Sequence, residues 1–162
     1  MDLVAAGPTF EPCDATGRKP MKTVAQMLKL KPAGVVSIRP DVPVLDVLKL
    51  LADKDVGAVL VMDGTRLAGI VSERDYARKV ELKGRSSSAT QVSEIMTREV
   101  VFVTPKQTNE DCMALMTGKR LRHLPVIENG QVVGVLSIGD LVKDAISEQQ
   151  FIIEQLEHYI HR

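Results

Sequence analysis

The apolar positions of this chain follow first a helical and then a strand-like period, and this succession occurs twice. One stretch has the i, i+3, i+4, i+7 spacing of a helix that buries one face, at Val44, Val47, Leu48 and Leu51. Apolar runs follow at 58–62 and 67–71, separated by Asp63-Gly64. Because such a dipeptide between apolar runs is a strong turn signal, we expect a β-hairpin there.

Shorter elements complete the unit. A helix is expected around 24–28 and a strand at 35–38, which ends before Pro40. A further helix is expected to begin just after Ser72. The predicted order is α-β-α-β-β-α, which is typical of an α/β (α+β-like) fold in which helices pack on a small mixed sheet.

The second half of the chain repeats the first. A shift of 65 positions places 35–80 on 100–145 without a gap, with 10 identities in 46 positions. Background residue usage would give roughly 3 identities. The copy predicts a strand at 100–103 and a hairpin turn at Asn129-Gly130. Its opening helix matches at a shift of 68, so the first copy carries 3 extra residues around Lys31. Two such units are expected to stack about a pseudo-twofold axis, with two related clefts.

Five segments are expected along the chain. Residues 1–22 contain several Gly and Pro without an apolar period and predict an N-terminal arm. The first repeat occupies 23–81 and the second 91–147, joined by a flexible, Ser-rich linker at 82–90. Residues 148–162 carry an apolar stripe at helical spacing. This stripe predicts an amphipathic helix that covers either its own core or a sister subunit.

Charge and composition argue against several classes of protein. Lys plus Arg and Asp plus Glu number 21 each, and 3% of the residues are aromatic, so no nucleic-acid surface is expected. No run approaches the length of a membrane span and no leader-like segment opens the chain, which favours a cytoplasmic protein without membrane contact. Cys13 and Cys112 follow no metal-ligand spacing, and Cys112 falls on a predicted helix as a small core residue. No nucleophile–base arrangement is found, so an enzyme is not expected.

The polar positions of most interest close each repeat, as Gly-x-x-Ser-x-x-Asp. They pair Ser72 with Asp75 and Ser137 with Asp140. One interpretation is structural: Ser caps the following helix and Asp completes a capping box. The other is functional: the carboxylate accepts the hydroxyls of a ribose, and Ser and free backbone N–H groups meet a phosphate. The two interpretations are compatible, since one residue pair can both cap a helix and bind a ligand.

Basic residues distinguish the two clefts. Arg122 and His123 enter the strand beside Ser137, whereas the first copy has Gly57 and Ala58 at these positions. A solvated strand end is one explanation, and a phosphate clamp specific to the second cleft is the other. Arg74, on the helix after Ser72, is either part of a solvated face or a phosphate contact at the first cleft.

The duplicated unit, its GIVSERD and GVLSIGD endings and the RHLPV strand at 122–126 resemble a tandem pair of CBS domains, a Bateman module. The resemblance covers about residues 23–146 and is closest to stand-alone modules of this family. It implies Ser72 and Asp75 as ligand contacts at one cleft, and Ser137 and Asp140 at the other. It further implies that the first strand of the opposite repeat contacts adenine, through Val101 and Val36 respectively. Arg122 and His123 occupy the family's phosphate positions, from which Gly57 and Ala58 depart. All four are expected at the Asp140 cleft.

The resemblance implies a regulatory module that binds an adenosine-containing nucleotide, AMP, ADP, ATP or NAD(H), between its repeats. Such modules commonly pair, so a homodimer is expected, with an unknown protein target as a further partner. Signalling would then require that the ligand bind two dimer geometries with different affinities. The alternative is a ligand-free dimeric interaction scaffold whose Ser/Asp pairs only cap helices.

Overall fold

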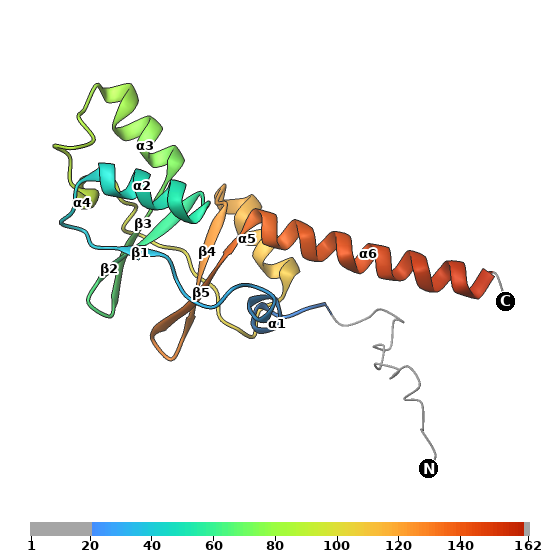
Figure 1. Ribbon diagram of the computed structural model, residues 1–162. Helices are drawn as coiled ribbons and strands as arrows, with labels where there is room; N and C mark the ends of the chain where they lie inside the picture. The colour runs from blue at the N-terminus through green and yellow to red at the C-terminus, as the bar shows by residue number, and fades with distance from the viewer. Residues whose placement is uncertain (1–20, 161–162) are drawn as a thin grey trace, which may run out of the picture.

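The structure, a computed structural model, describes residues 21–160. The predicted N-terminal arm, 1–22, and Cys13 therefore lie almost wholly outside the described residues. The first repeat contains α1 Val24–Lys29, β1 Ser37–Ile38, α2 Val44–Lys54, β2 Ala58–Asp63, β3 Arg66–Ser72 and α3 Glu73–Lys79 (Figure 1). The second contains α4 Val92–Ile95, α5 Asn109–Lys119, β4 His123–Glu128, β5 Gln131–Ser137 and α6 Ile138–Ile160. The predicted mixed α/β architecture, two small sheets with packed helices, is confirmed.

The two sheets differ in one strand. In the first, β1 pairs parallel to β2, which pairs antiparallel to β3. The strand expected at 100–103 is wrong, since only Val103 forms a parallel bridge, to Val126, beside the β4–β5 hairpin. In the first repeat the Leu60 amide donates to the Val36 carbonyl. Its counterpart in the second repeat is Pro125, which has no N–H, so this rung of the ladder cannot form.

The hairpin turns lie close to their predicted places. Asn129-Gly130 forms the second turn with φ of 51° and 77°, as the sequence predicts. The first turn is wrong by one residue, because Asp63 pairs with Arg66 and leaves Gly64-Thr65 as the connection. Gly64 takes the positive φ, of 62°. In a two-residue hairpin loop that position suits glycine, whose missing Cβ removes the steric penalty.

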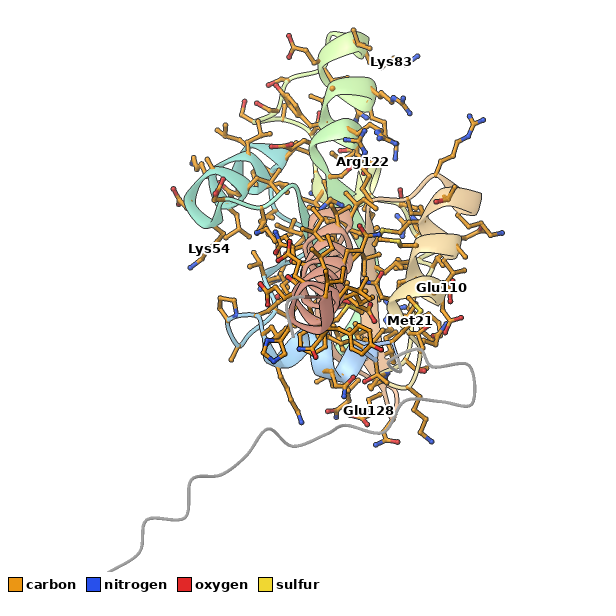
Figure 2. All side chains as sticks on the ribbon, turned by 90° about the vertical axis from the view of Figure 1, so that its right-hand side faces the viewer. Met21, Lys54, Lys83, Glu110, Arg122 and Glu128 are labelled. Carbon is orange, nitrogen blue, oxygen red and sulfur yellow. The ribbon has the colours of Figure 1, made fainter. Side chains whose placement is uncertain are left out.

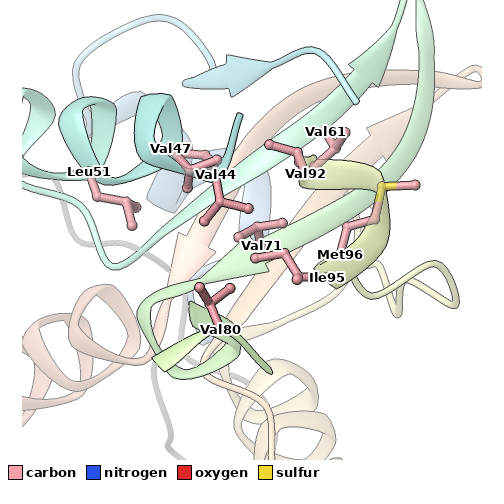
Figure 3. Packing of buried hydrophobic residues seen from close by; sticks show 10 residues of the cluster. Val44, Val47, Leu51, Val61, Val71, Val80, Val92, Ile95 and Met96 are labelled. Atoms are coloured by element: carbon pink, nitrogen blue, oxygen red, sulfur yellow. The ribbon is translucent and has the colours of Figure 1, made fainter. Parts of the chain in front are cut away.

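Each opening helix packs on the other repeat. In Figure 3, Val92, Ile95 and Met96, at α4, lie in the core of the first repeat with α2, β2 and β3. Conversely, Val24 and Met27 of α1 belong to the core of the second repeat. The exchange interlocks the two repeats, because neither core is closed without a helix from its partner.

The linker expected to be flexible at 82–90 is instead fixed to the fold. The Val44 amide donates to the Thr90 carbonyl at 2.8 Å, and the Leu45 amide donates to Ser87 at 3.0 Å. An Arg85–Glu94 ion pair at 2.6 Å adds a side-chain contact. The reason lies in α2, whose N-cap is Pro43 with no side-chain hydrogen bond, so its free amides take linker carbonyls instead.

The C-terminal apolar stripe is helical, as predicted, and continues without a break from the last helix of the second repeat. This single helix, α6, runs beyond the two sheets (Figure 1). Every residue from 149 to 160 is exposed, including Ile153 and Leu156. Within the described part of the chain, no helix is both long enough and apolar enough to cross a membrane.

Candidate functional site

A cleft of about 850 Å³ lies where the two repeats meet, at the start of α6. Both repeats contribute to its wall. The sequence-predicted residues that line it are Val36, Gly57, Ala58, His123, Ser137 and Asp140. The structure thus places Val36 and Asp140, more than 100 positions apart in the sequence, around one cavity. Val36, expected within a strand at 35–38, lies just before the shorter β1.

Ser137 and Asp140 form a capping box at the start of α6. The Ser137 backbone amide and Oγ donate to Asp140 Oδ2 at 2.8 and 3.0 Å, and the Asp140 amide donates to Ser137 Oγ at 3.2 Å. The structural interpretation of this motif is therefore confirmed. It does not displace the functional one, because the carboxylate also borders the cleft.

Lys31 was not predicted as a site residue, yet it contacts Asp140 directly. Its ammonium donates to Asp140 Oδ2 and to the Val135 carbonyl, both at 2.7 Å. The only sequence signal was the 3-residue insertion around Lys31, which has no equivalent in the second repeat. The insertion lies directly after α1, and α1 packs on the second repeat, so Lys31 reaches the opposite repeat's carboxylate.

Two opposing effects set the ionisation of Asp140. Partial burial on its own raises the carboxyl pKa, but hydrogen bonds from Lys31 and the Ser137 amide, with the Lys31 charge, outweigh it. The net result is an Asp140 pKa below its usual value. Asp140 is therefore ionised at neutral pH, and its carboxylate acts only as a hydrogen-bond acceptor.

His123 faces the backbone of Gly57 across the cleft. A Cβ at Gly57 would lie 3.4 Å from both Cε1 and Nε2 of the ring, so the glycine leaves room for the imidazole. Burial lowers the His123 pKa, and the charges of Lys31 and Arg122 lower it further, against a smaller opposing effect of Asp140. Within these protein surroundings the imidazole is mainly neutral at pH 7.

Arg122 does not line the cleft with its neighbour. Its side chain is exposed, while its backbone carbonyl accepts a hydrogen bond from the Ile138 amide at 2.8 Å. Lys54, at the end of α2, borders the cleft instead. Figure 2 shows Arg122 and Lys54 at well separated places on the molecule. Since neither periodicity nor the repeat comparison distinguished Lys54, sequence reasoning had no signal for it.

The first Ser/Asp pair repeats the capping geometry with different surroundings. Ser72 Oγ donates to Asp75 Oδ2 at 2.8 Å, and Lys79, on the same helix, pairs with Oδ1 at 2.8 Å. Of the other predicted residues, Arg74 is exposed on α3, and Val101 is half-buried against the second core.

Backbone pairing distinguishes β3 of the first repeat from β5 of the second. In the first repeat Ile70 and Thr97 exchange both backbone hydrogen bonds, at 2.9 and 3.0 Å, so this strand is covered by main chain. The counterpart of Ile70 in the second repeat is Val135, whose carbonyl accepts the Lys31 ammonium instead. A side chain thus contacts β5 at the Asp140 cleft, where the corresponding position of β3 in the first repeat is paired with backbone.

The remaining polar chemistry of the described residues is limited. Between 21 and 160, no group of three or more His, Cys, Asp and Glu side chains could hold a metal ion. Cys112 is fully buried, as expected of a core residue, and burial raises its thiol pKa to about 11. The thiol is therefore protonated and unreactive at neutral pH.

Comparison with known proteins agrees with this architecture. The CBS domain family model matches residues 31–82 and 92–146. Two interlocked copies of this unit in one chain define a tandem CBS module, and the chain belongs to the CBS domain family.

Relatives share this arrangement. The chain is 41% identical over 125 residues to the mitochondrial CBS domain-containing protein CBSX3 of Arabidopsis thaliana, covering 74% of this chain and 61% of that relative. A CBS-domain protein from Burkholderia ambifaria MC40-6 superposes with a TM-score of 0.77 at 53% identity, over 79% of this chain and 96% of its own. CBS domain protein PAE2072 from Pyrobaculum aerophilum, complexed with AMP, gives 0.65 at 25% identity, over 73% and 88%.

Proposed function

We propose that this protein is a regulatory module that binds an adenosine-containing nucleotide, AMP, ADP, ATP or NAD(H), in the cleft at Asp140. The observation that carries the proposal is an ionised carboxylate, capped at the start of α6, that borders a cleft lined by both repeats. The AMP complex of a structural relative supports the choice of ligand class. The relative's sequence is distant, so the residue assignments rest on this chain's own geometry.

Each part of the cleft suits one part of such a ligand. The Asp140 carboxylate can accept hydrogen bonds from ribose hydroxyls, which are donors. Val36, with the small residues Gly57 and Ala58, offers an apolar wall for a purine ring. Lys31 and His123 supply cationic or proton-donating groups for phosphate. We propose no catalytic step, and the output would be a change in the protein's own geometry.

We further propose that the protein works as a homodimer in which α6 packs on α6 of a second copy. A subset of the exposed positions of α6, mostly apolar, is spaced at alternating intervals of four and three residues: Val142, Ile146, Gln149, Ile153, Leu156 and Ile160. This is the spacing of a coiled-coil seam, with isoleucine at every a position and Val, Gln and Leu at d. Isoleucine at a with leucine at d favours two-stranded pairing. Ile153, Leu156 and Ile160 at the end of the helix follow this rule, so a second copy is the partner that we propose.

Native mass spectrometry of the purified protein tests both proposals together, since it reports bound mass and subunit number. A thermal-shift series with AMP, ATP and NADH then ranks ligands, because a ligand that binds only the folded state raises the unfolding midpoint. Guanosine monophosphate serves as the control for the base. If none of the adenine nucleotides binds while the protein remains dimeric, the interaction-scaffold alternative stands instead.

A further inference from the structure

The Asp140 carboxylate is already hydrogen-bonded within the protein. Its Oδ2 accepts three hydrogen bonds, from the Ser137 amide, Ser137 Oγ and the Lys31 ammonium. A carboxylate oxygen has two lone pairs, so Oδ2 has no capacity for a further donor. A vicinal diol that binds both carboxylate oxygens must therefore displace one of these three donors. The two donors from Ser137 belong to the cap of α6, which leaves the Lys31 ammonium.

Lys31 is the donor that can leave. Its backbone is anchored, because its amide donates to the Leu28 carbonyl and Leu28 packs directly on Gly134, where a Cβ would lie 2.6 Å from Cδ2. Its side chain is one-third exposed, however, and reaches the cleft from the edge. The ammonium can thus rotate without any change in the packing of α1.

We propose that Lys31 is a phosphate-responsive latch: it holds Asp140 in the unliganded protein and turns to the ligand's phosphate when the ribose takes its place. This inference rests on the proposed function of the cleft and assigns its selectivity for phosphorylated ligands to one residue. A nucleoside displaces Lys31 but has no phosphate with which the ammonium could form a new ion pair. A nucleotide displaces it and supplies an anion, so the cation keeps a charged partner.

The first cleft provides an internal comparison. Lys79 also contacts its aspartate and a backbone carbonyl, Ile95, at 2.8 and 2.7 Å. It lies on the same helix as Asp75, however, and binds Oδ1, leaving the capped Oδ2 to Ser72. Lys79 is therefore an i, i+4 helix pair, whereas Lys31 joins two repeats.

Calorimetric titration of parent and Lys31→Met with AMP and with adenosine tests the latch. We expect AMP affinity to fall by about tenfold or more in the variant, while adenosine affinity is kept or rises several-fold. The ratio of AMP to adenosine affinity is therefore expected to fall at least tenfold. Lys31→Arg, which retains the charge, should keep most of the preference, and Lys29→Met, which removes an exposed charge from α1, should leave the ratio unchanged.

Other outcomes distinguish a failure of the proposed latch from a failure of the proposed nucleotide site. If Lys31→Met lowers the unfolding midpoint but leaves the ratio of AMP to adenosine affinity unchanged, Lys31 only stabilises the packing of α1 on the second repeat, and the latch is refuted. A proportional loss for both ligands also refutes it, while the proposed site stands. If the parent binds neither compound, the nucleotide site and the latch fall together. Lys79→Met should leave the ratio at the Asp140 cleft unchanged, and a change there would contradict the assignment to Lys31.

Discussion

The imidazole of His123 lies directly against the backbone of Gly57, at the position where the first repeat enters the cleft of the second. A Cβ added to Gly57 would stand 3.4 Å from Cε1 and Nε2 of the ring, which is the near limit of ordinary contact. Gly57 and His123 are not equivalent positions of the two repeats: Gly57 corresponds to Arg122 in the repeat alignment, and His123 to Ala58. The loss of a side chain in one repeat thus accommodates a ring from the other.

Enlarging Gly57 should close the cleft from this side. In Gly57→Val the methyl groups would overlap the His123 ring, which must move into the cavity. We expect AMP affinity to fall by about tenfold, with a loss of stability of about 1–3 kcal/mol from overpacking. Calorimetry and urea unfolding measure the two effects. Gly118→Val, which places its Cβ in open space, is the control, and equal affinities in both variants would contradict this account of Gly57.

Binding of a phosphorylated ligand should depend on pH through His123. Its pKa is lowered in the unliganded protein by burial and by Lys31 and Arg122, against the opposing charge of Asp140. A bound phosphate raises this pKa, so binding takes up a proton. The contribution of His123 to AMP affinity is therefore greatest below its free-state pKa and is lost as pH rises through the bound-state value.

Titrations between about pH 5.5 and 8 measure this dependence around the ordinary histidine range. His123→Gln should remove the His123 contribution from the AMP curve and leave only the slope due to the phosphate, whose second pKa is about 6. Adenosine, without a phosphate, should show little slope in either protein. Glu73, whose carboxylate lies near Gly57, is an acidic group beside this part of the cleft, as is Asp55 in the cleft lining, and Glu73→Gln is the matched control. An AMP curve that is unchanged by His123→Gln would make the imidazole a bystander.

The exposed stripe of α6 should determine the oligomeric state. Ile153→Glu places a charge in the centre of the proposed seam, where burial of an unpaired carboxylate is unfavourable, and should shift the protein towards monomer. His158→Glu introduces the same side chain on the opposite face of the helix and should leave the dimer intact. Sedimentation velocity over a range of concentrations measures both. Identical profiles for the two variants would contradict pairing through α6.

A buried polar cluster should contribute to stability independently of the ligand. Asp144 is 7% exposed and accepts hydrogen bonds from Lys22 Nζ at 2.6 Å and Asn109 Nδ2 at 2.7 Å. Asp144→Ala leaves these donors without their acceptor and should cost about 1–3 kcal/mol in urea unfolding. Asp63→Ala, which breaks an exposed pair with Arg66, should cost at most about 1 kcal/mol. Equal losses at one protein concentration would contradict the importance of burial.

Local sequence signals predicted much of this fold. The helix at Val44, both hairpins and the Ser/Asp caps depend on contacts within a few residues, and all are present. The misplaced features depend on distant partners. The strand expected at 100–103 is reduced to one bridge because Pro125 lacks a donor, and the linker is ordered because Pro43 leaves α2 uncapped.

The same distinction holds for the candidate site. Ser137 and Asp140 were predicted because their motif occurs twice, and Val36 because the resemblance implied it. Lys31 was missed because its role follows from the exchange of opening helices, which no local pattern encodes. Arg122 was grouped with His123 by proximity in sequence, but it precedes β4, which begins at His123. Its side chain accordingly stays exposed, outside the cleft lining.

The central claim, that an adenine nucleotide binds at the Asp140 cleft, is tested most directly by calorimetric titration of AMP into Asp140→Ala and Asp75→Ala. Loss of charge-assisted hydrogen bonds to ribose should weaken binding by about 10- to 100-fold in Asp140→Ala. Asp75→Ala removes the matching cap of the first repeat and should change AMP affinity at the second cleft little. If both variants bind AMP like the parent, and Asp140→Ala only loses the roughly 1 kcal/mol of a helix cap, Asp140 is a structural residue and the proposed site is wrong.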